Sequence, residues 1–187
     1  MSEYLFQGAR IIAPVTFESE TVNFFNELID LSEERFQLPG QRFTFSFNTE
    51  AGGHIAVWAH MVDNVTASFS FTVPQPESPL LVLGDLQESM DSASSAGAVG
   101  IVDPNGVFTA GRFIKFSGHD KIYLVTAGGY ITKIFPALVA DVAAGETIYY
   151  GDNVVAKVMY AKDQVQNITF NNGVLSSAGT IKLVEDV

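Results

Sequence analysis

The stretch Gly111–Leu138, GRFIKFSGHDKIYLVTAGGYITKIFPAL, carries the clearest signal for the fold of this chain. Two runs rich in branched and aromatic side chains, Phe113–Phe116 and Lys121–Val125, flank the four residues Ser117–Asp120, which is the spacing of a β-hairpin. A pair of glycines then turns the chain into a third run, Tyr130–Phe135, which ends at a proline. The stretch therefore predicts three strands joined by tight turns.

The same β-rich pattern extends over most of the chain. Phe43, Phe45 and Phe47 alternate with polar residues, which predicts a strand with one buried face. An opening strand is expected at 10–17, where Pro14 favours an edge strand or a strand start. The sequence therefore predicts a mainly β fold, an antiparallel β-sandwich or small barrel with one or two short helices as a minor α+β element. Further strands are expected at 67–73, 147–150, 153–160, 168–170 and 180–184.

Two short helices are predicted from apolar residues at helical spacing. The first begins near Ser19, a residue that can cap a helix, and repeats apolar residues from Val22 to Leu28 or Ile29. The second ends near Asn64, and its apolar residues recur at i, i+3, i+4 and i+7, which predicts one buried face. That face consists of Ile55, Trp58, Ala59 and Val62.

The length of 187 residues favours one β-rich structural domain over residues 1–187, or one domain that carries an insertion. Three prolines place a sub-module boundary near 74–80. The small, polar residues at about 87–97 predict a flexible loop or a hairpin tip. The apolar run Val99–Val102 is expected to return antiparallel to Leu80–Leu83, and a tight turn is expected at Asp103–Gly106.

Composition narrows the classes of partner. The chain carries 21 acidic and 10 basic residues, a net charge of −11 that repels nucleic-acid phosphates, so no specific nucleic-acid binding is expected. It has no cysteine, which excludes disulfides and thiolate metal sites and favours folding in a reducing cytoplasm. The longest mostly apolar run, Ile134–Ala144, falls well short of the roughly 20 residues that span a bilayer. The N-terminus does not resemble a secretory signal, so the chain is expected to stay where it is made.

The residue types of catalytic and metal sites occur here in unsuitable arrangements. Ser117, His119 and Asp120 lie within one four-residue turn, where their side chains splay apart and cannot line up as a hydrolytic triad. His119 is expected to be an exposed turn residue, and Gly118 is expected to take a positive φ. His54 and His60 are six residues apart, which is the wrong spacing for two metal ligands on one helical face.

Two further motifs are also better explained by turns. Asp103–Gly106 resembles the start of a calcium loop, but Ile114 stands where that loop needs a glutamate. Gly97–Gly100 lacks the lysine and hydroxyl residues of a phosphate-binding loop. We therefore expect no catalytic, cofactor-binding or metal-binding residues, no cofactor and no enzymatic activity.

The order of these elements and the hairpin sequence resemble a family of tailed-bacteriophage virion proteins, which are tail components. In that family an alternating strand, a helix and a second alternating strand closed by proline precede a hairpin of the form Gly-Asp-Phe-Ile-x-Phe-x-Gly-His-x-Lys-Val-Tyr-x-Val-Thr. An Ile-x-Pro-x-Leu strand follows. The resemblance covers roughly residues 41–187, and Arg112 replaces the usual aspartate. The matching residues are Gly111, Phe113, Ile114, Phe116, Gly118, His119, Lys121, Tyr123, Val125 and Thr126.

The resemblance implies a structural role in assembly. Proteins of this kind build rings at the distal end of the tail tube or at its junction with the baseplate, where copies close around a channel. The implied partners are further copies of the chain and other phage tail proteins, and the implied location is the virion, after synthesis in the host cytoplasm. A channel with acidic walls would let DNA pass without adhering, which fits the net charge of −11.

Two alternative functions remain open. A capsid decoration or cement protein is also small, acidic, cysteine-free and β-rich, and its location on the head would distinguish it from a tail protein. A carbohydrate-binding or hydrolytic β module is suggested by Trp58 and the many Tyr and Phe residues. Glycan sites usually combine exposed aromatic rings with carboxylates, whereas most aromatic residues here alternate inward.

Overall fold

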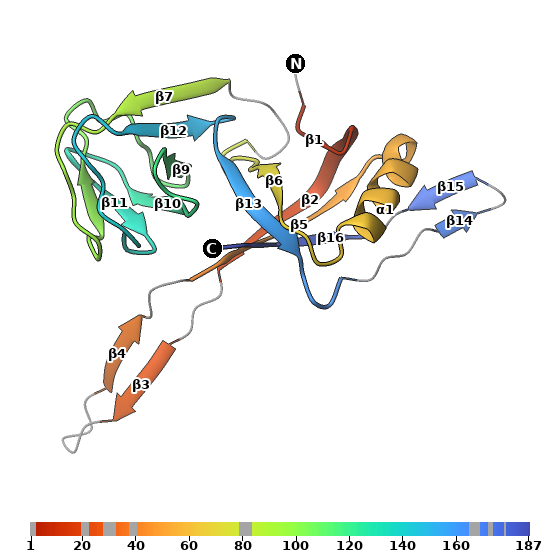
Figure 1. Cartoon of the computed structure of the whole chain (residues 1–187), viewed down its shortest axis with the longest axis horizontal. Coiled ribbons are helices and arrows are strands. Elements are labelled where there is room, and N and C mark those ends of the chain that lie inside the picture. The colour runs from red at the N-terminus through yellow and green to blue at the C-terminus, as the bar shows by residue number, and fades with distance from the viewer. Residues whose placement is uncertain are drawn as a thin grey trace.

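The computed structural model describes residues 3–19, 23–27, 33–37, 41–78, 84–164, 169–171, 174–177 and 179–187. Over these residues the chain forms two six-stranded antiparallel sheets, two separate hairpins, one α-helix and one short 3-10 turn (Figure 1). The prediction of a mainly β, antiparallel fold with a short helix is confirmed. No helix in the described part of the chain is long and apolar enough to cross a membrane.

The first sheet, called sheet 1, joins strands from both ends of the sequence in the order β1-β2-β5-β16-β13-β6. The sequence alternation of β5 places Phe43, Phe45 and Phe47 on one face, and all three are buried. Phe45 pairs with Leu183 of β16, so the centre of the sheet depends on contacts between distant segments. The strands are β1 (Leu5–Phe6), β2 (Ala9–Ser19), β5 (Phe43–Thr49), β6 (Phe69–Thr72), β13 (Val155–Tyr160) and β16 (Ile181–Glu185).

The second sheet, called sheet 2, is built from one continuous segment in the order β7-β12-β9-β10-β11-β8. The predicted hairpin is present, with Tyr123 of β10 opposite Ile114 of β9. The chain leaves sheet 1 after β6 and returns to it at β13, so sheet 2 is an insertion in sequence. The strands are β7 (Asp85–Ser89), β8 (Gly100–Val102), β9 (Phe113–Phe116), β10 (Ile122–Ala127), β11 (Ile131–Phe135) and β12 (Thr147–Gly151).

Both faces of the β9–β10 hairpin are buried, which explains its nearly continuous apolar sequence. Phe113 and Ile122 belong to the core of sheet 1, together with Val57 and Met61 of the helix. The residues that alternate with them form a second core on the other face of sheet 2. That core includes Ile114, Phe116, Tyr123, Val125 and Ile148. The β9–β10 hairpin therefore lies between the two cores and contributes side chains to both.

The helix predicted after Ser19 is wrong. In its place β3 (Asn23–Glu27) and β4 (Glu33–Gln37) form an antiparallel hairpin, which Figure 1 shows extending away from the two sheets. The helical spacing covered only a few apolar residues, whereas the adjacent aromatic residues Phe24 and Phe25 favour a strand. A second small hairpin joins β14 (Thr169–Asn171) to β15 (Val174–Ser177).

The predicted flexible loop at about 87–97 is partly a strand. Residues 87–89 belong to β7 and pair with β12, because the edge of β12 offers backbone partners to a polar strand. Farther along, Ser94 forms a bridge with Val142, and the Gly97 amide donates to the Leu138 carbonyl at 2.7 Å. Most of this segment is therefore attached to sheet 2 by backbone hydrogen bonds.

One prediction about sheet 2 needs correction, and another falls outside the described residues. The strand β8 pairs with β11, and the partner expected for it at 80–83 is among the residues that the structure does not describe. Gly118 does not have a positive φ, whereas Gly111 (φ 90°) and Gly129 (φ 141°) do. Gly118 instead lies close to the end of the Glu146 side chain: its amide donates to Oε1 at 2.8 Å, and an added Cβ would lie 2.9 Å from that atom.

Candidate functional site

Polar residues of the hairpin motif form contacts inside the protein, and Lys121 is the main example. Its ammonium group forms a fully buried ion pair with Glu185 of β16 and lies 4.9 Å from the centre of the Phe43 ring. Oε1 of Glu185 also accepts the Ile122 amide at 2.8 Å, and Oε2 accepts the Phe43 amide at 3.2 Å. Burial lowers the pKa of Lys121, which Glu185 partly offsets. The pair links sheet 2 to sheet 1 and is closed to solvent.

His119 is buried, so the prediction of an exposed turn histidine is wrong. Nδ1 lies 2.8 Å from the hydroxyl of Tyr123, which also accepts the Val139 amide at 3.3 Å. Burial raises the pKa of Tyr123 to about 12. The Asp141 carbonyl can only accept, so Nε2 donates to it at 3.4 Å, and Nδ1 accepts from the Tyr123 hydroxyl. The ring is thus fixed by Tyr123 and Asp141, and not by Ser117 or Asp120, so no triad forms.

The carboxylate of Asp103 accepts hydrogen bonds from the turn that begins at this residue and from a neighbouring strand. Oδ1 accepts the Val107 amide at 3.1 Å, while Oδ2 accepts the Phe108 amide at 3.0 Å and the Thr132 hydroxyl at 3.2 Å. Asp103 is buried, and Gly106 adopts a positive φ of 62° in the same turn. The arrangement is that of a tight turn, as the sequence predicted.

The remaining histidines each have a structural partner. Nε2 of His54 lies 2.7 Å from the Thr49 carbonyl, and Nδ1 of His60 lies 2.7 Å from the Tyr160 hydroxyl. Burial lowers the pKa of His60. Within the described ranges, no three His, Asp or Glu side chains gather in a group that could hold a metal ion.

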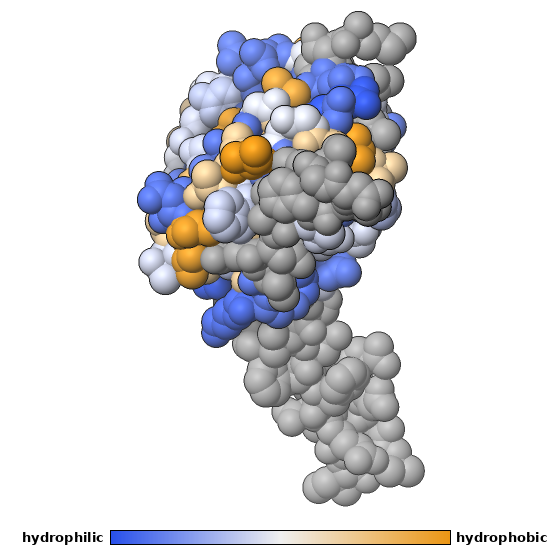
Figure 2. Space-filling view, turned by 90° about the vertical axis from the view of Figure 1, so that its right-hand side faces the viewer, coloured by the Kyte–Doolittle hydropathy of each residue, from blue (hydrophilic) through white to orange (hydrophobic). Residues whose placement is uncertain are grey.

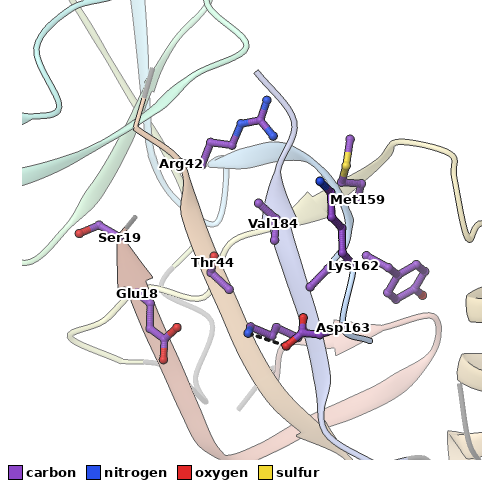
Figure 3. Close-up of a pocket in the computed structure, with 11 residues that line it drawn as sticks. Glu18, Ser19, Arg42, Thr44, Met159, Lys162, Asp163 and Val184 are labelled. Atoms are coloured by element: carbon purple, nitrogen blue, oxygen red, sulfur yellow. Dashed lines mark hydrogen bonds and ion pairs between the residues drawn. The ribbon is translucent and has the colours of Figure 1, made fainter. Parts of the chain in front are cut away.

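A hollow of about 350 Å³ lies on the outward face of sheet 1, where the ends of β2, β5, β13 and β16 meet (Figure 3). Arg42 lies at one end of the view, and Asp163 forms an ion pair with Lys182 at 3.1 Å near the other. The hydrogen bond from Lys182 lowers the pKa of Asp163. The lining mixes acidic, basic and small polar residues without a nucleophile–base pair, so it is a polar surface hollow. It is lined by Glu18, Ser19, Arg42, Thr44, Met159, Tyr160, Ala161, Lys162, Asp163, Lys182 and Val184.

The helix α1 (His54–Asp63) carries an exposed apolar surface. The predicted buried face is wrong, because Ile55, Trp58 and Val62 are 61%, 37% and 49% exposed. The opposite side, with Val57 and Met61, packs into the core of sheet 1. Figure 2 looks onto the side of the molecule that carries α1 and shows apolar residues among the polar ones. Ile55, Trp58, Val62 and the nearby Val65, which is 49% exposed, are called the α1 surface below.

A second exposed apolar surface lies at the β8–β11 edge of sheet 2. Val99, Tyr130 and Ile131 are 62%, 68% and 62% exposed, and Val139 is 44% exposed. They follow the paired strands β8 and β11: the Tyr130 carbonyl accepts the Asp103 amide at one end of the pairing, and the Val99 carbonyl accepts the Ile134 amide at the other. These four residues are called the β11 surface below. Sequence reasoning missed it, since Tyr130 and Ile131 read as an ordinary strand start.

The sequence matches no known protein-family model, and no curated protein is significantly similar to it. Function is therefore inferred from the surfaces of the chain and from the hairpin motif.

Proposed function

We propose that this chain is a structural component of a phage virion, a tail or baseplate ring protein that assembles around the tail channel. The observation that carries the proposal is the pair of exposed apolar surfaces, the α1 surface and the β11 surface, on an otherwise strongly acidic chain. Apolar residues that gather on an exposed surface of a soluble protein often mark a site that another protein covers. Such surfaces are expected in a subunit that buries them on assembly.

The internal use of the motif residues supports a structural role. In the described part of the chain, Lys121, His119 and Tyr123 are all buried and bonded to other parts of the same chain. They hold the hairpin against β16 and against the backbone at Val139 and Asp141. Because the polar residues of the motif are bonded within the chain, we expect the motif to stabilise the fold and not to take part in a reaction.

The proposal is tested first by the mass of the purified chain in solution and by its appearance in negative stain. Light scattering is expected to give a multiple of 20.2 kDa, and images are expected to show closed rings. A chain that stays monomeric at every concentration and ionic strength would contradict a ring built from this protein alone.

The location on the virion is the second test. Gold-labelled antibodies against the chain are expected to bind the tail or its distal end on intact phage particles. Labelling of the head would instead support the capsid decoration alternative, and unlabelled particles would exclude a place on the virion surface. Channel walls lined by Lys and Arg in an image of the ring would contradict the acidic channel.

A further inference from the structure

We infer that the α1 surface of one copy of this chain docks on the β11 surface of the next copy, in a head-to-tail contact. This inference rests on the proposed function, because it names the two surfaces through which copies of the ring subunit would meet. The contact is heterologous: each copy uses one surface to receive and the other to donate, which generates rings when the rotation closes.

The α1 surface has the features of a helix that is covered in the assembled state. A helix on the surface of a monomer normally places polar residues toward solvent. Here the solvent side of α1 consists of Ile55, Ala56, Trp58, Ala59 and Val62, and Asp63 is its one charged residue. Trp58 lies in the middle of this row, and a central tryptophan ringed by smaller apolar residues is the composition of an interface anchor.

The β11 surface offers a partner of matching chemistry. Ile131 lies over Gly100, with its Cγ2 atom 3.1 Å from the position that a Cβ on Gly100 would take. Gly100 therefore leaves room for the Ile131 side chain, which lies across β8 and is itself 62% exposed, and Tyr130 next to it is 68% exposed. A helix with one large aromatic anchor can bury these exposed apolar side chains against its own.

The positions of the two surfaces favour a contact between copies. Figure 1 shows α1 and β11 on opposite sides of the molecule along its longest axis, so the surfaces cannot cover each other within one chain. Each surface also carries an exposed charge of opposite sign beside it, Asp63 next to Val62 and Lys133 two residues after Ile131. In the described part of the chain neither Asp63 nor Lys133 forms an ion pair. A second copy thus supplies both the apolar partner and the opposite charge.

The net charge of −11 sets the conditions for this contact. Two copies repel each other at long range, while the apolar contact acts only at short range. Added salt screens the repulsion and leaves the burial of apolar surface intact. Assembly is therefore expected to strengthen when the ionic strength is raised.

The absence of cysteine allows a direct test by cross-linking. Trp58→Cys and Ile131→Cys are made as separate single variants of the full chain, and far-UV circular dichroism checks that each folds. A flexible bis-maleimide is then added to each variant alone and to their mixture. The matched control mixes Ile131→Cys with Lys162→Cys, whose residue is exposed but lies at the hollow on sheet 1.

A cross-linked dimer in the Trp58→Cys and Ile131→Cys mixture, and in neither variant alone nor in the control, is the expected result. Dimers of Trp58→Cys alone would overturn the inference, because they would show a symmetric contact between helices. An assembled chain without cross-links in the mixture would also overturn it but would leave the ring function standing. A chain that forms neither assemblies nor cross-links would contradict both.

Polar substitutions give an independent readout by the mass of the assembly. Trp58→Ser and Ile131→Ser are each expected to weaken self-association, by about thirtyfold for the tryptophan, as for other central aromatic anchors. Ala59→Ser is the matched control on the same helix, because it changes little apolar area. Equal association of wild type and Trp58→Ser, with folding confirmed, would rule out the contact.

Discussion

Sheet 1 and sheet 2 differ in how the sequence builds them. Sheet 2 uses only the segment from Asp85 to Gly151, and its central hairpin joins neighbouring strands through a short turn. Sheet 1 joins β2 and β5 to β13 and β16 across the whole insertion. Closing such distant segments costs more chain entropy before their contacts form. Sheet 2 is therefore the locally specified part of the molecule, and sheet 1 depends on long-range packing.

The two sheets are nevertheless connected, because residues of sheet 2 pack into the hydrophobic core of sheet 1. Phe113 lies against the rings of Phe43 and Phe45, with ring centres 5.1 and 6.1 Å apart. Lys115 of β9 also donates to the Val155 carbonyl of β13 at 2.8 Å. The core of sheet 1 is incomplete without the β9–β10 hairpin. We therefore expect the two sheets to unfold together.

The strongest test of this coupling compares one core substitution in each sheet. Phe45→Ala and Phe116→Ala each remove a fully buried ring and are expected to cost about 3–5 kcal/mol of unfolding free energy. Trp58 is the chain's one tryptophan and lies on α1 beside sheet 1, so its fluorescence reports that region. The Trp58 transition in denaturant should shift for both variants. If Phe116→Ala left that transition unchanged, the sheets would be independent folding units.

The ion pair between the sheets gives a second test. Glu185→Gln keeps one acceptor oxygen, which can serve only one of the Ile122 and Phe43 amides, and leaves the Lys121 charge buried without a counter-ion, at a cost of about 3–5 kcal/mol. The added substitution Lys121→Met removes that charge and is expected to recover part of the loss. Urea unfolding of the two single variants and the double variant measures this coupling. Additive losses in the double variant would show that the pair does not join the sheets.

Local patterns in the sequence predicted many strands, but they did not predict the long-range pairing of sheet 1. The strands of sheet 2 other than β7 could be predicted from the sequence, because branched and aromatic runs alternate with turns that contain glycine, such as Asp103–Gly106 and Gly128–Gly129. The strand β5 was also predicted, from its alternating phenylalanines, but its pairing with β16 could not be, since no local pattern specifies a partner more than a hundred residues away. The β3–β4 hairpin was missed because a few apolar residues fit both helical and strand spacing.

The surfaces were less predictable than the strands. The helix α1 has apolar residues on both sides, so the period indicated a helix but could not select the buried face. The buried side also holds the polar residue His54, whose ring forms a hydrogen bond with the Thr49 carbonyl beside Val57 and Met61. The burial of Lys121 could not be predicted from the sequence either, because its partner Glu185 is distant in the chain.

Glycines at close contacts provide a third, smaller test in each sheet. A Cβ on Gly53 would overlap Ala9 of β2, and one on Gly128 would overlap the Phe108 carbonyl. Gly53→Ala and Gly128→Ala are therefore each expected to cost about 1–3 kcal/mol. Gly52→Ala is the matched control, because a Cβ there has no neighbour within 4 Å. It should leave the thermal midpoint unchanged or raise it slightly. A control as unstable as Gly53→Ala would show that chain flexibility, and not overlap, is responsible.

The smallest expected effect concerns alkaline pH and the network around Tyr123. Burial raises its pKa to about 12 in the folded chain, whereas an unfolded tyrosine titrates near 10. Between these values the unfolded chain releases a proton that the folded chain keeps, so the free energy of unfolding falls as the pH rises from about 10 to about 12. Tyr4 and Tyr160 are also raised by burial and act in the same direction. Tyr123→Phe is expected to be less stable at neutral pH, because His119 loses a partner, but to show a shallower loss above pH 10. Urea unfolding at several alkaline pH values measures both, and an unchanged slope in Tyr123→Phe would mean that this hydroxyl does not hold its proton in the folded chain.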